Sequence, residues 1–303
     1  MIKLKLALDW TPNVNHIGFF IANELGFYKE QGIDLEILNP KDDNYSMTPG
    51  KKLELDFADF AIAPFETVIS LNNKVNQVQA MAIYAIMQKD LSSIVTLKSS
   101  NITSPKLLDG KTYASYKARY EDHIVKEMIK NDEGKGDLNI IYPEKLGIWN
   151  TLLTGNADAT WIFDNWEGIE ASGKNIELNN FTLGEFDIPY GYSPVVLTKM
   201  ENLIKQKGLY SKFIKATKKG FLYPKNNLIE STEILSRYVT EYDLNNIDLE
   251  KALLFSIPNF GDFSSAGFMN QDRVSGFIQW LVDKGLENET ILNQSLFTNE
   301  LLE

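Results

Sequence analysis

Short apolar segments with strand periodicity alternate with helical segments, and this alternation constrains the fold more than any other feature of the chain. Strands are expected at residues 4–8, 34–38, 59–62 and 79–84. Helices are expected between them, at residues 16–31 and 65–71, and Gly32 should end the first of these. Strands separated by helices favour a mainly parallel sheet, because each parallel pair needs a crossover.

The same pattern starts again after Gln88. Strands are expected at residues 94–97, 111–115, 138–142 and 159–163, with helices at 120–131 and 148–153. The chain should cross back near residues 193–197, and helices then dominate, including 210–223 and 272–286. The sequence thus predicts an α/β protein with two lobes: lobe I (1–89 plus 196–303) and lobe II (90–195). A ligand cleft is expected between the lobes, where loops follow the carboxyl ends of strands.

Charge and cysteine content exclude several classes of function. The formal net charge of -11 repels phosphate backbones and anionic lipid headgroups, so neither a nucleic-acid partner nor membrane insertion is expected. The chain has no cysteine, which removes disulfides, thiolate metal sites and cysteine nucleophiles together. With only two histidines, no metal site is expected, and no cofactor is firmly implied.

The first residues bear on localisation. Residues 1–9 alternate apolar side chains with lysines and lack the apolar core and small-residue cleavage site of a signal peptide. No apolar run is long enough to span a membrane. As written, the chain is expected to be cytoplasmic. A chain from which a leader had been trimmed would instead be extracytoplasmic.

Several segments carry a family resemblance. The segments 8–16 (LDWTPNVNH), 26–34 (GFYKEQGID), 59–66 (DFAIAPFE), 109–113 (DGKTY), 161–170 (WIFDNWEGIE) and 192–195 (YSPV) occur in that order. Together they resemble the thiamine-pyrimidine branch of the periplasmic-binding-protein superfamily. The resemblance spans nearly the whole chain and implies a type II periplasmic-binding-protein-like fold.

That branch has two kinds of member, and the resemblance implies one of two functions. Solute-binding proteins deliver formylaminopyrimidine or related compounds to an ABC importer. The enzyme makes hydroxymethylpyrimidine phosphate from a pyridoxal phosphate held on a lysine, with a nearby histidine and a cysteine-rich iron-binding motif. Here residues 62–67, where the lysine and histidine would fall, contain neither, and cysteine is absent.

Binding of a small thiamine-precursor-type pyrimidine, by a receptor or carrier, is therefore the first hypothesis. An ABC importer would be its partner if the chain is exported. The alternative is a cytoplasmic synthase-like enzyme that acts without the cysteine motif, and pyridoxal phosphate enters only there. A Schiff base needs an amine, so this alternative would require other residues.

A 4-aminopyrimidine has a flat face and a polar edge, so its site needs aromatic walls. Five aromatic residues are stacking candidates, namely Trp10, Trp161, Trp166, Tyr190 and Tyr192. Core packing is the alternative for each of them. That alternative is strongest for Trp161, which lies inside an expected strand, whereas Trp10 and Trp166 are expected in loops.

The polar edge of the ring needs an acceptor, and three acids end or follow apolar segments. Asp9, Glu66 and Glu170 could each accept a hydrogen bond from the pyrimidine amine. Capping of a following helix is the alternative for Asp9 and Glu66, and solvent exposure is the alternative for Glu170. Three further ligand-binding candidates lie in the first loop, namely Asn13, Asn15 and His16. Asn15 is also expected to be a helix N-cap.

The loop Ser115-Tyr116-Lys117-Ala118-Arg119 joins an expected strand to an expected helix. Free backbone amides at a helix start favour anions, and the lysine and arginine add positive charge. The sequence therefore predicts a phosphate-binding loop and a ligand that carries a phosphate. Solvated surface charge is the alternative.

Overall fold

The structure is a computed structural model that describes residues 1–75, 78–143 and 148–302. Its backbone contacts divide the chain into two compact units. Unit 1 comprises Met1–Asp90, Gly191–Asn245 and Leu249–Glu303, and unit 2 comprises Leu91–Tyr190 and Asn246–Asp248. The sequence predicts lobe I as residues 1–89 plus 196–303 and lobe II as residues 90–195. These boundaries of separately folding lobes stay a prediction.

Unit 1 contains a five-stranded sheet. Its strands in spatial order are β2 (Ile33–Leu38), β1 (Ile2–Ala7), β3 (Phe60–Ala63), β10 (Val195–Lys199) and β4 (Ala80–Ala85). The first helices of this unit are α1 (Ile17–Glu24), α2 (Phe27–Glu30), α3 (Pro49–Glu54) and α4 (Glu66–Asn72). The later helices are α8 (Met200–Lys205), α9 (Lys207–Leu222), α10 (Leu228–Ser236), α11 (Glu241–Asn246), α12 (Leu249–Ser256) and α13 (Gln271–Asp283).

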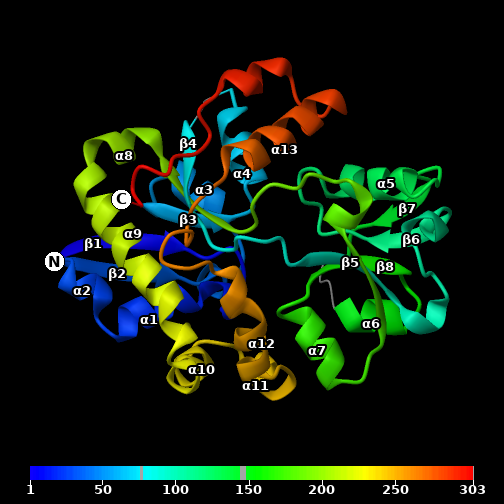
Figure 1. Cartoon of the computed structure of the whole chain (residues 1–303), viewed down its shortest axis with the longest axis horizontal. Helices are drawn as coiled ribbons and strands as arrows, with labels where there is room; N and C mark the ends of the chain where they lie inside the picture. The colour runs from blue at the N-terminus through cyan, green and yellow to red at the C-terminus, as the bar shows by residue number, and fades with distance from the viewer. Residues whose placement is uncertain (76–77, 144–147, 303) are drawn as a thin grey trace. The chain divides into compact units, whose positions relative to one another are not determined.

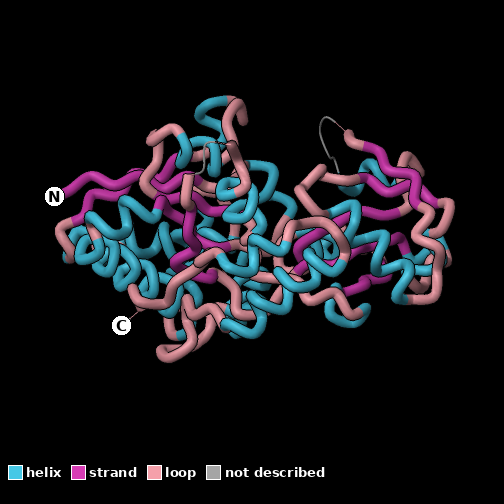
Figure 2. Tube along the Cα trace, turned by 90° about the horizontal axis from the view of Figure 1, so that it is seen from above, coloured by secondary structure: helices cyan, strands magenta, loops and turns pink. Residues whose placement is uncertain are grey.

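Unit 2 contains a second five-stranded sheet. Its strands in spatial order are β7 (Leu138–Ile141), β6 (Lys111–Ala114), β8 (Ala159–Phe163), β5 (Ser92–Leu97) and β9 (Leu178–Thr182). Its helices are α5 (Glu121–Asn131), α6 (Ile148–Leu153) and α7 (Glu167–Gly173), and Figure 1 shows all three near this sheet. Helices and strands alternate along the trace in Figure 2.

The two sheets share one pattern of strand directions. In unit 1, β10 runs antiparallel to both β3 and β4, and the other strands run together. In unit 2, β5 runs antiparallel to both β8 and β9. Each sheet therefore has four strands in one direction and one reversed strand in the fourth place. The predicted α/β fold with mainly parallel sheets is confirmed, in a mixed form.

One local expectation needs correction, and two strands were not foreseen. The single helix expected at residues 16–31 is two helices, because Gly26 adopts a left-handed conformation with φ of 75° and turns the chain between α1 and α2. The crossing segment near Val195 is itself a strand, β10. Strand β9 was not expected, because Asn179 and Asn180 interrupt its apolar pattern.

Helices α1 and α9 pack closely because two glycines lie where they cross. A Cβ added at Gly220 would lie 2.0 Å from the carbonyl oxygen of Gly18. A Cβ at Gly18 would lie 2.2 Å from the Phe221 ring. Any larger residue at either position would push α9 off α1 and disturb the packing of Phe213 on Phe60 of β3.

Each unit has its own core. In unit 1 the buried rings of Phe60 and Phe213 stack with centroids 4.0 Å apart, and Tyr28 stacks on Phe213 at 5.5 Å. The buried Tyr28 hydroxyl pairs with Thr217 Oγ1 at 2.8 Å, and burial raises the pKa of Tyr28. In unit 2 the buried cluster comprises Val95, Ala114, Trp149, Leu152, Ala157, Ile162 and Ala171. These cores fix the strands whose ends carry the candidate site residues.

Candidate functional site

The loop after β1 is held by a reciprocal cap. Asn13 is extended, with φ of -150°, and its side chain accepts a hydrogen bond from the Asn15 amide at 2.8 Å. Its own backbone amide donates to His16 Nδ1 at 3.1 Å. A one-turn 3-10 helix (Val14–His16) results, and α1 follows directly. Hydrogen bonds within the loop therefore hold its conformation without a ligand.

Asp9 and His16 form a pair in this loop. His16 is fully buried, and its Nε2 lies 2.7 Å from Asp9 Oδ1. Because Nδ1 accepts the Asn13 amide, Nε2 carries the proton in the neutral ring and donates to Asp9. The Asp9 side chain keeps 27% of its surface exposed. One oxygen is thus fixed by the imidazole, while part of the carboxylate stays accessible to an amine donor.

One expectation for this loop, and the alternative given for Asp9, are wrong. The N-cap is Asn13 and not Asn15, because the turn begins two residues earlier than the periodicity indicates. Asn15 is buried inside the turn. Asp9 does not cap a helix, since its carboxylate contacts the His16 ring.

Glu66 is the first residue of α4 and is buried. An acid in the first turn of a helix interacts favourably with the partial positive charge of the free amides there. The cap position itself is Phe65, whose amide donates to the carbonyl of Tyr192 at 2.9 Å. Glu66 therefore lies at a strand-to-helix turn that is tied to the segment entering β10.

The ring of Tyr192 is already covered on one side. The Arg273 guanidinium lies 4.0 Å from the ring centroid, and the Tyr192 hydroxyl accepts from the Asn270 amide at 2.9 Å. Arg273 also donates to the carbonyls of Gln88 and Gly191, at 2.7 and 2.5 Å. These contacts give Tyr192 a structural role. Arg273 ties together segments distant in sequence, which no local pattern indicates.

Trp10, another stacking candidate of unit 1, differs from Tyr192. Trp10 is 48% exposed and lies at a tilted angle to Tyr45, with ring centroids 6.2 Å apart. A large aromatic ring left in solvent next to a polar pair is available for stacking. Trp10 therefore fits the expectation of a ligand-facing ring better than Tyr192 does.

In unit 2, Trp161 and Tyr190 form an aromatic pair. Trp161 lies on β8 and contacts Tyr190 edge to face, with centroids 5.7 Å apart and planes at 60°. Both side chains are only half-buried. Trp161 is therefore not a core residue, and the pair presents an aromatic corner beside β8.

Trp166 and Glu170 are buried around the start of α7. Trp166 occupies the N-cap position of α7 and is 4% exposed. Glu170 is 6% exposed, and Lys174 Nζ donates to its Oε1 at 2.6 Å. The alternative for Glu170, a solvent-exposed helix acid, is wrong, because Glu170 is buried, and its role as a ligand contact stays a prediction. Its charge is matched one turn later by Lys174.

The loop predicted to bind phosphate contacts its own chain. The amides of Tyr116 and Ala118 donate to the two carboxylate oxygens of Glu121, each at 3.0 Å. The amide of Lys117 donates to Ser115 Oγ at 2.9 Å. The expectation that these amides are free is therefore wrong, because Glu121, the first residue of α5, folds back on them.

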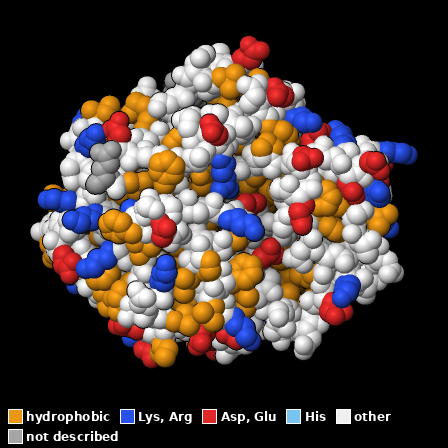
Figure 3. Space-filling view, in the orientation of Figure 1, with side chains coloured by type: hydrophobic (Ala, Val, Ile, Leu, Met, Phe, Trp, Pro, Cys, Tyr) orange, Lys and Arg blue, Asp and Glu red, His pale blue; other side chains and the backbone are white. Residues whose placement is uncertain are grey.

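The basic side chains of this loop lie elsewhere. Lys117 Nζ lies 5.4 Å from the centroid of the Tyr142 ring, and Arg119 Nε donates to the Tyr120 hydroxyl at 2.8 Å. Both residues are exposed. On the face drawn in Figure 3, lysine and arginine side chains lie among acidic ones. Phosphate binding by residues 115–119 stays a prediction. The amides of Tyr116, Lys117 and Ala118 do not support it, because each already donates to a side chain of the protein.

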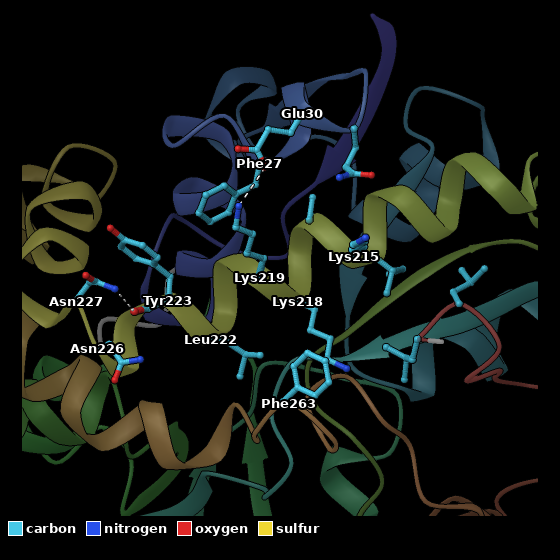
Figure 4. A pocket seen from close by; sticks show the side chains of 15 residues that line it. Phe27, Glu30, Lys215, Lys218, Lys219, Leu222, Tyr223, Asn226, Asn227 and Phe263 are labelled. Atoms are coloured by element: carbon cyan, nitrogen blue, oxygen red, sulfur yellow. Dashed lines mark hydrogen bonds and ion pairs between the residues drawn. The ribbon is translucent and has the colours of Figure 1, made fainter.

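A separate cavity of about 770 Å³ lies in unit 1, between α2, α9 and the C-terminal segment. In Figure 4 Lys219 points toward Phe27, with its Nζ 3.7 Å from the ring centroid, and Lys218 lies 5.1 Å from that of Phe263. Lys219 also pairs with Glu30 at 3.1 Å. None of the predicted site residues lines this cavity.

The family model described as NMT1/THI5 like matches residues 13–227, which contain Asn13, Trp161, Tyr190 and Glu121 but not Asp9 or Trp10. The chain belongs to the NMT1/THI5 like family. This confirms the resemblance read from the sequence.

Curated relatives of this NMT1/THI5 like chain carry names of both functional kinds. The formylaminopyrimidine-binding protein of Halalkalibacterium halodurans is 24% identical over 254 residues, which is 81% of this chain and 72% of that protein. A putative thiamine biosynthesis protein of Haemophilus influenzae is 24% identical over 218 residues, or 68% of this chain and 64% of that protein. The 4-amino-5-hydroxymethyl-2-methylpyrimidine phosphate synthase of Legionella pneumophila is 31% identical over 113 residues, or 36% of this chain and 33% of that protein.

Solved structures similar to this NMT1/THI5 like chain share its fold over nearly full length. The alkanesulfonate-binding protein SsuA of Xanthomonas axonopodis pv. citri has a TM-score of 0.72 at 10% identity and covers 98% of each chain. The ligand-binding component of an ABC-type import system of Staphylococcus aureus has a TM-score of 0.71 at 13% identity, covering 100% of this chain and 98% of that one. The predicted periplasmic-binding-protein fold is confirmed.

Neither a metal-binding cluster nor a membrane-spanning helix occurs in the described ranges. Among residues 1–75, 78–143 and 148–302, no group of three or more histidines, aspartates and glutamates is placed to hold a metal ion. Within the same ranges, no helix combines the length and the hydropathy that crossing a bilayer requires.

Proposed function

We propose that this chain binds a small thiamine-precursor-type pyrimidine and acts as a solute-binding receptor or carrier. The observation that carries the proposal is the Asp9 carboxylate, which buried His16 holds while part of it stays exposed. A 4-aminopyrimidine donates hydrogen bonds from its exocyclic amine, and a fixed carboxylate accepts such a bond at low entropic cost. The name of the Halalkalibacterium relative, a formylaminopyrimidine-binding protein, supports the same ligand class.

The flat face of the ring needs aromatic partners, and we assign Trp10 in unit 1 and the Trp161–Tyr190 pair in unit 2 to that role. All three rings keep exposed surface. Trp166 and Tyr192 are given supporting roles instead, since Trp166 is buried and Tyr192 stacks under Arg273. A ligand position between two lobes stays a prediction.

A receptor of this kind delivers its ligand to an ABC importer, and we propose such a partner for this chain. The similar Staphylococcus protein is the ligand-binding component of an ABC-type import system, which supports the proposal. That role requires a location outside the cytoplasmic membrane. Fractionation of cells that express the natural gene, with detection of the chain in each fraction, tests it.

The synthase alternative is not favoured, because the residues present do not fit pyridoxal phosphate. The turn from β3 into α4 (residues 62–67) offers no lysine amine and no histidine. Among the described residues, the two buried lysines are Lys52 and Lys199, and each is paired, with Asp43 at 3.0 Å and Asp56 at 2.7 Å. The loop that would hold the cofactor's phosphate donates its amides to Glu121.

Calorimetric titration with 4-amino-5-hydroxymethyl-2-methylpyrimidine and its formylamino analogue tests the proposed function. We expect saturable binding by the wild type and a loss of about tenfold or more in affinity for Asp9→Asn, since a hydrogen bond to a charged group contributes about 1.5–3 kcal/mol. Asp34→Asn is the matched control, because Asp34 is exposed on β2 of the same unit. Absence of binding by every pyrimidine, or a lysine adduct after incubation with pyridoxal phosphate, would overturn the proposal.

A further inference from the structure

The loop between β6 and α5 contains an anion supplied by the chain itself. Glu121 is 3% exposed, and its Oε1 accepts from the Tyr116 amide at 3.0 Å and from the Tyr113 hydroxyl at 2.7 Å. Its Oε2 accepts from the Ala118 amide at 3.0 Å. Two amides and a hydroxyl thus converge on one buried carboxylate at the start of an 11-residue helix.

These donors are of the kind that bind the oxygens of a phosphate at a helix start. A carboxylate has two oxygens on one carbon, so it satisfies two loop amides at once, as two oxygens of a phosphate would. The backbone is shaped around it, since Lys117 between the two donors adopts the left-handed conformation with φ of 63°. A non-glycine residue is rarely held there unless neighbouring contacts favour it.

A second carboxylate closes the other side of the loop. Asp122 Oδ1 accepts from Ser115 Oγ at 2.7 Å, and its Oδ2 accepts from the Tyr142 hydroxyl at 2.6 Å. A phosphate placed at this loop would therefore meet two negative charges and no free donor among Tyr116, Lys117 and Ala118. Like charges at such short range repel each other, most strongly near Glu121, which is buried.

We propose that Glu121 is a specificity-determining residue: it occupies the anion position of this loop and thereby selects an unphosphorylated pyrimidine over its phosphate ester. The inference rests on the proposed function for the identity of the ligand. It replaces the phosphorylated ligand that the loop sequence predicts. The occupation of the loop by Glu121 can be tested without any pyrimidine.

The first experiment removes the internal anion and offers a free one. Glu121→Ala is titrated with sodium phosphate and with sodium formate, against sodium chloride at equal ionic strength, by calorimetry and by thermal unfolding. We expect the variant to gain saturable phosphate binding and a higher unfolding temperature in formate or phosphate than in chloride. The wild type should show neither change. Glu133→Ala is the matched control, because the Glu133 side chain is 90% exposed in the same unit.

A folded Glu121→Ala that responds to phosphate and formate no more than the control does would overturn the proposal. If the variant is unfolded in chloride, we expect formate or phosphate to restore its circular dichroism. If no salt restores it, Glu121→Gln decides, since it keeps the volume and one acceptor oxygen but loses the charge. An unchanged preference between the two pyrimidines in Glu121→Gln then overturns the proposal.

The second experiment measures the preference itself, with 4-amino-5-hydroxymethyl-2-methylpyrimidine and its phosphate ester. We expect the wild type to bind the unphosphorylated compound about tenfold or more tightly, and both Glu121 variants to narrow that ratio by at least about threefold. A wild type that prefers the phosphate ester overturns the inference. If neither compound binds, the proposed function fails, while the phosphate and formate titrations still judge the role of Glu121.

Discussion

The loops after β1 and β6 occupy the same place in their sheets, since each strand is second in its spatial order, yet they use their acids in opposite ways. After β1, Asp9 lies in the loop, and His16, at the end of the 3-10 helix, forms a hydrogen bond with its carboxylate. After β6, Glu121 belongs to the helix and turns back onto the loop amides. The Asp9 side chain keeps exposed surface that a ligand could contact. The Glu121 carboxylate is buried and already accepts hydrogen bonds from backbone amides. A strand-end acid is therefore a candidate ligand contact only where the backbone does not already need it.

The largest effect should come from removing the acid that the backbone needs. Glu121→Ala leaves two loop amides and the Tyr113 hydroxyl without their acceptor, and each unsatisfied buried donor costs about 1–3 kcal/mol. We expect the free energy of unfolding, measured in urea with a unit 2 fluorescence signal, to fall by about 3 kcal/mol. Glu133→Ala should change it by less than about 0.5 kcal/mol. A loss of under about 1 kcal/mol for Glu121→Ala would contradict the comparison.

In the loop after β1, we expect His16 to contribute more than Asp9 to the free energy of unfolding. His16→Ala removes a fully buried ring and two hydrogen bonds, so we expect a loss of about 2–3 kcal/mol in the free energy of unfolding. Asp9→Asn keeps the shape and an acceptor oxygen, so it should lose less than about 1 kcal/mol. The same urea unfolding measurement compares them. Equal losses from the two substitutions would show that Asp9 is as structural as Glu121.

The aromatic residues offer a matched pair of the same type. Trp161→Ala removes a half-buried ring that faces Tyr190, and we expect pyrimidine affinity to fall by about tenfold, since stacking on an aromatic side chain contributes about 1–3 kcal/mol. Trp280→Ala, a change in the buried face of α13, should lower stability instead and leave affinity within about twofold. Calorimetry of both variants sharpens the distinction between ligand-facing and packing rings. A larger affinity loss for Trp280→Ala would contradict it.

The smallest expected effect is the contribution of Glu121 to the pH dependence of the free energy of unfolding. Burial raises the pKa of the Glu121 carboxyl above its ordinary value of 4.5, although the hydroxyl of Tyr113 and the loop amides oppose the rise. A raised pKa means that the folded protein binds this proton more tightly. Its stabilising contribution is therefore complete below the ordinary value and is lost as the pH rises through the raised pKa.

We therefore expect the stability of the wild type, relative to Glu121→Gln, to decrease as the pH rises from about 4 and then to level off. The slope should stay below about 1.4 kcal/mol per pH unit, the limit for one proton. Urea unfolding of both proteins across this range measures it. A relative stability that increases with pH would contradict the burial of Glu121.

Much of the fold was predictable because its signals are local. Apolar periodicity placed β1, β2, β6 and β8 and the helix α6 within a few residues, and the restart of the pattern indicated two sheets. Strand β9 and the direction of β10 were not predictable, because partners far along the chain determine them. Gly26 gave a usable signal for the break between α1 and α2, which the apolar periodicity concealed.

The site was less predictable, for a physical reason. The sequence indicates which residue types lie near strand ends, but burial and hydrogen-bond partners decide which of them can face a ligand. Asp9 and Glu121 both lie near strand ends, and only the distances to His16 and to the loop amides separate their roles. The sequence does contain one hint, since Glu121 follows Ala118 at the spacing of an acid that reaches back to a loop amide.

The reversed strand in unit 1 affects how the chain is made. Strand β4 ends at Ala85, and the strand that pairs with it in the sheet, β10, begins at Val195. During translation at roughly 5–20 residues per second, β4 must wait several seconds with an unpaired edge while the whole of Leu91–Tyr190 emerges and can fold. Nascent unit 1 thus keeps this strand edge unpaired while the Leu91–Tyr190 part of unit 2 is already complete.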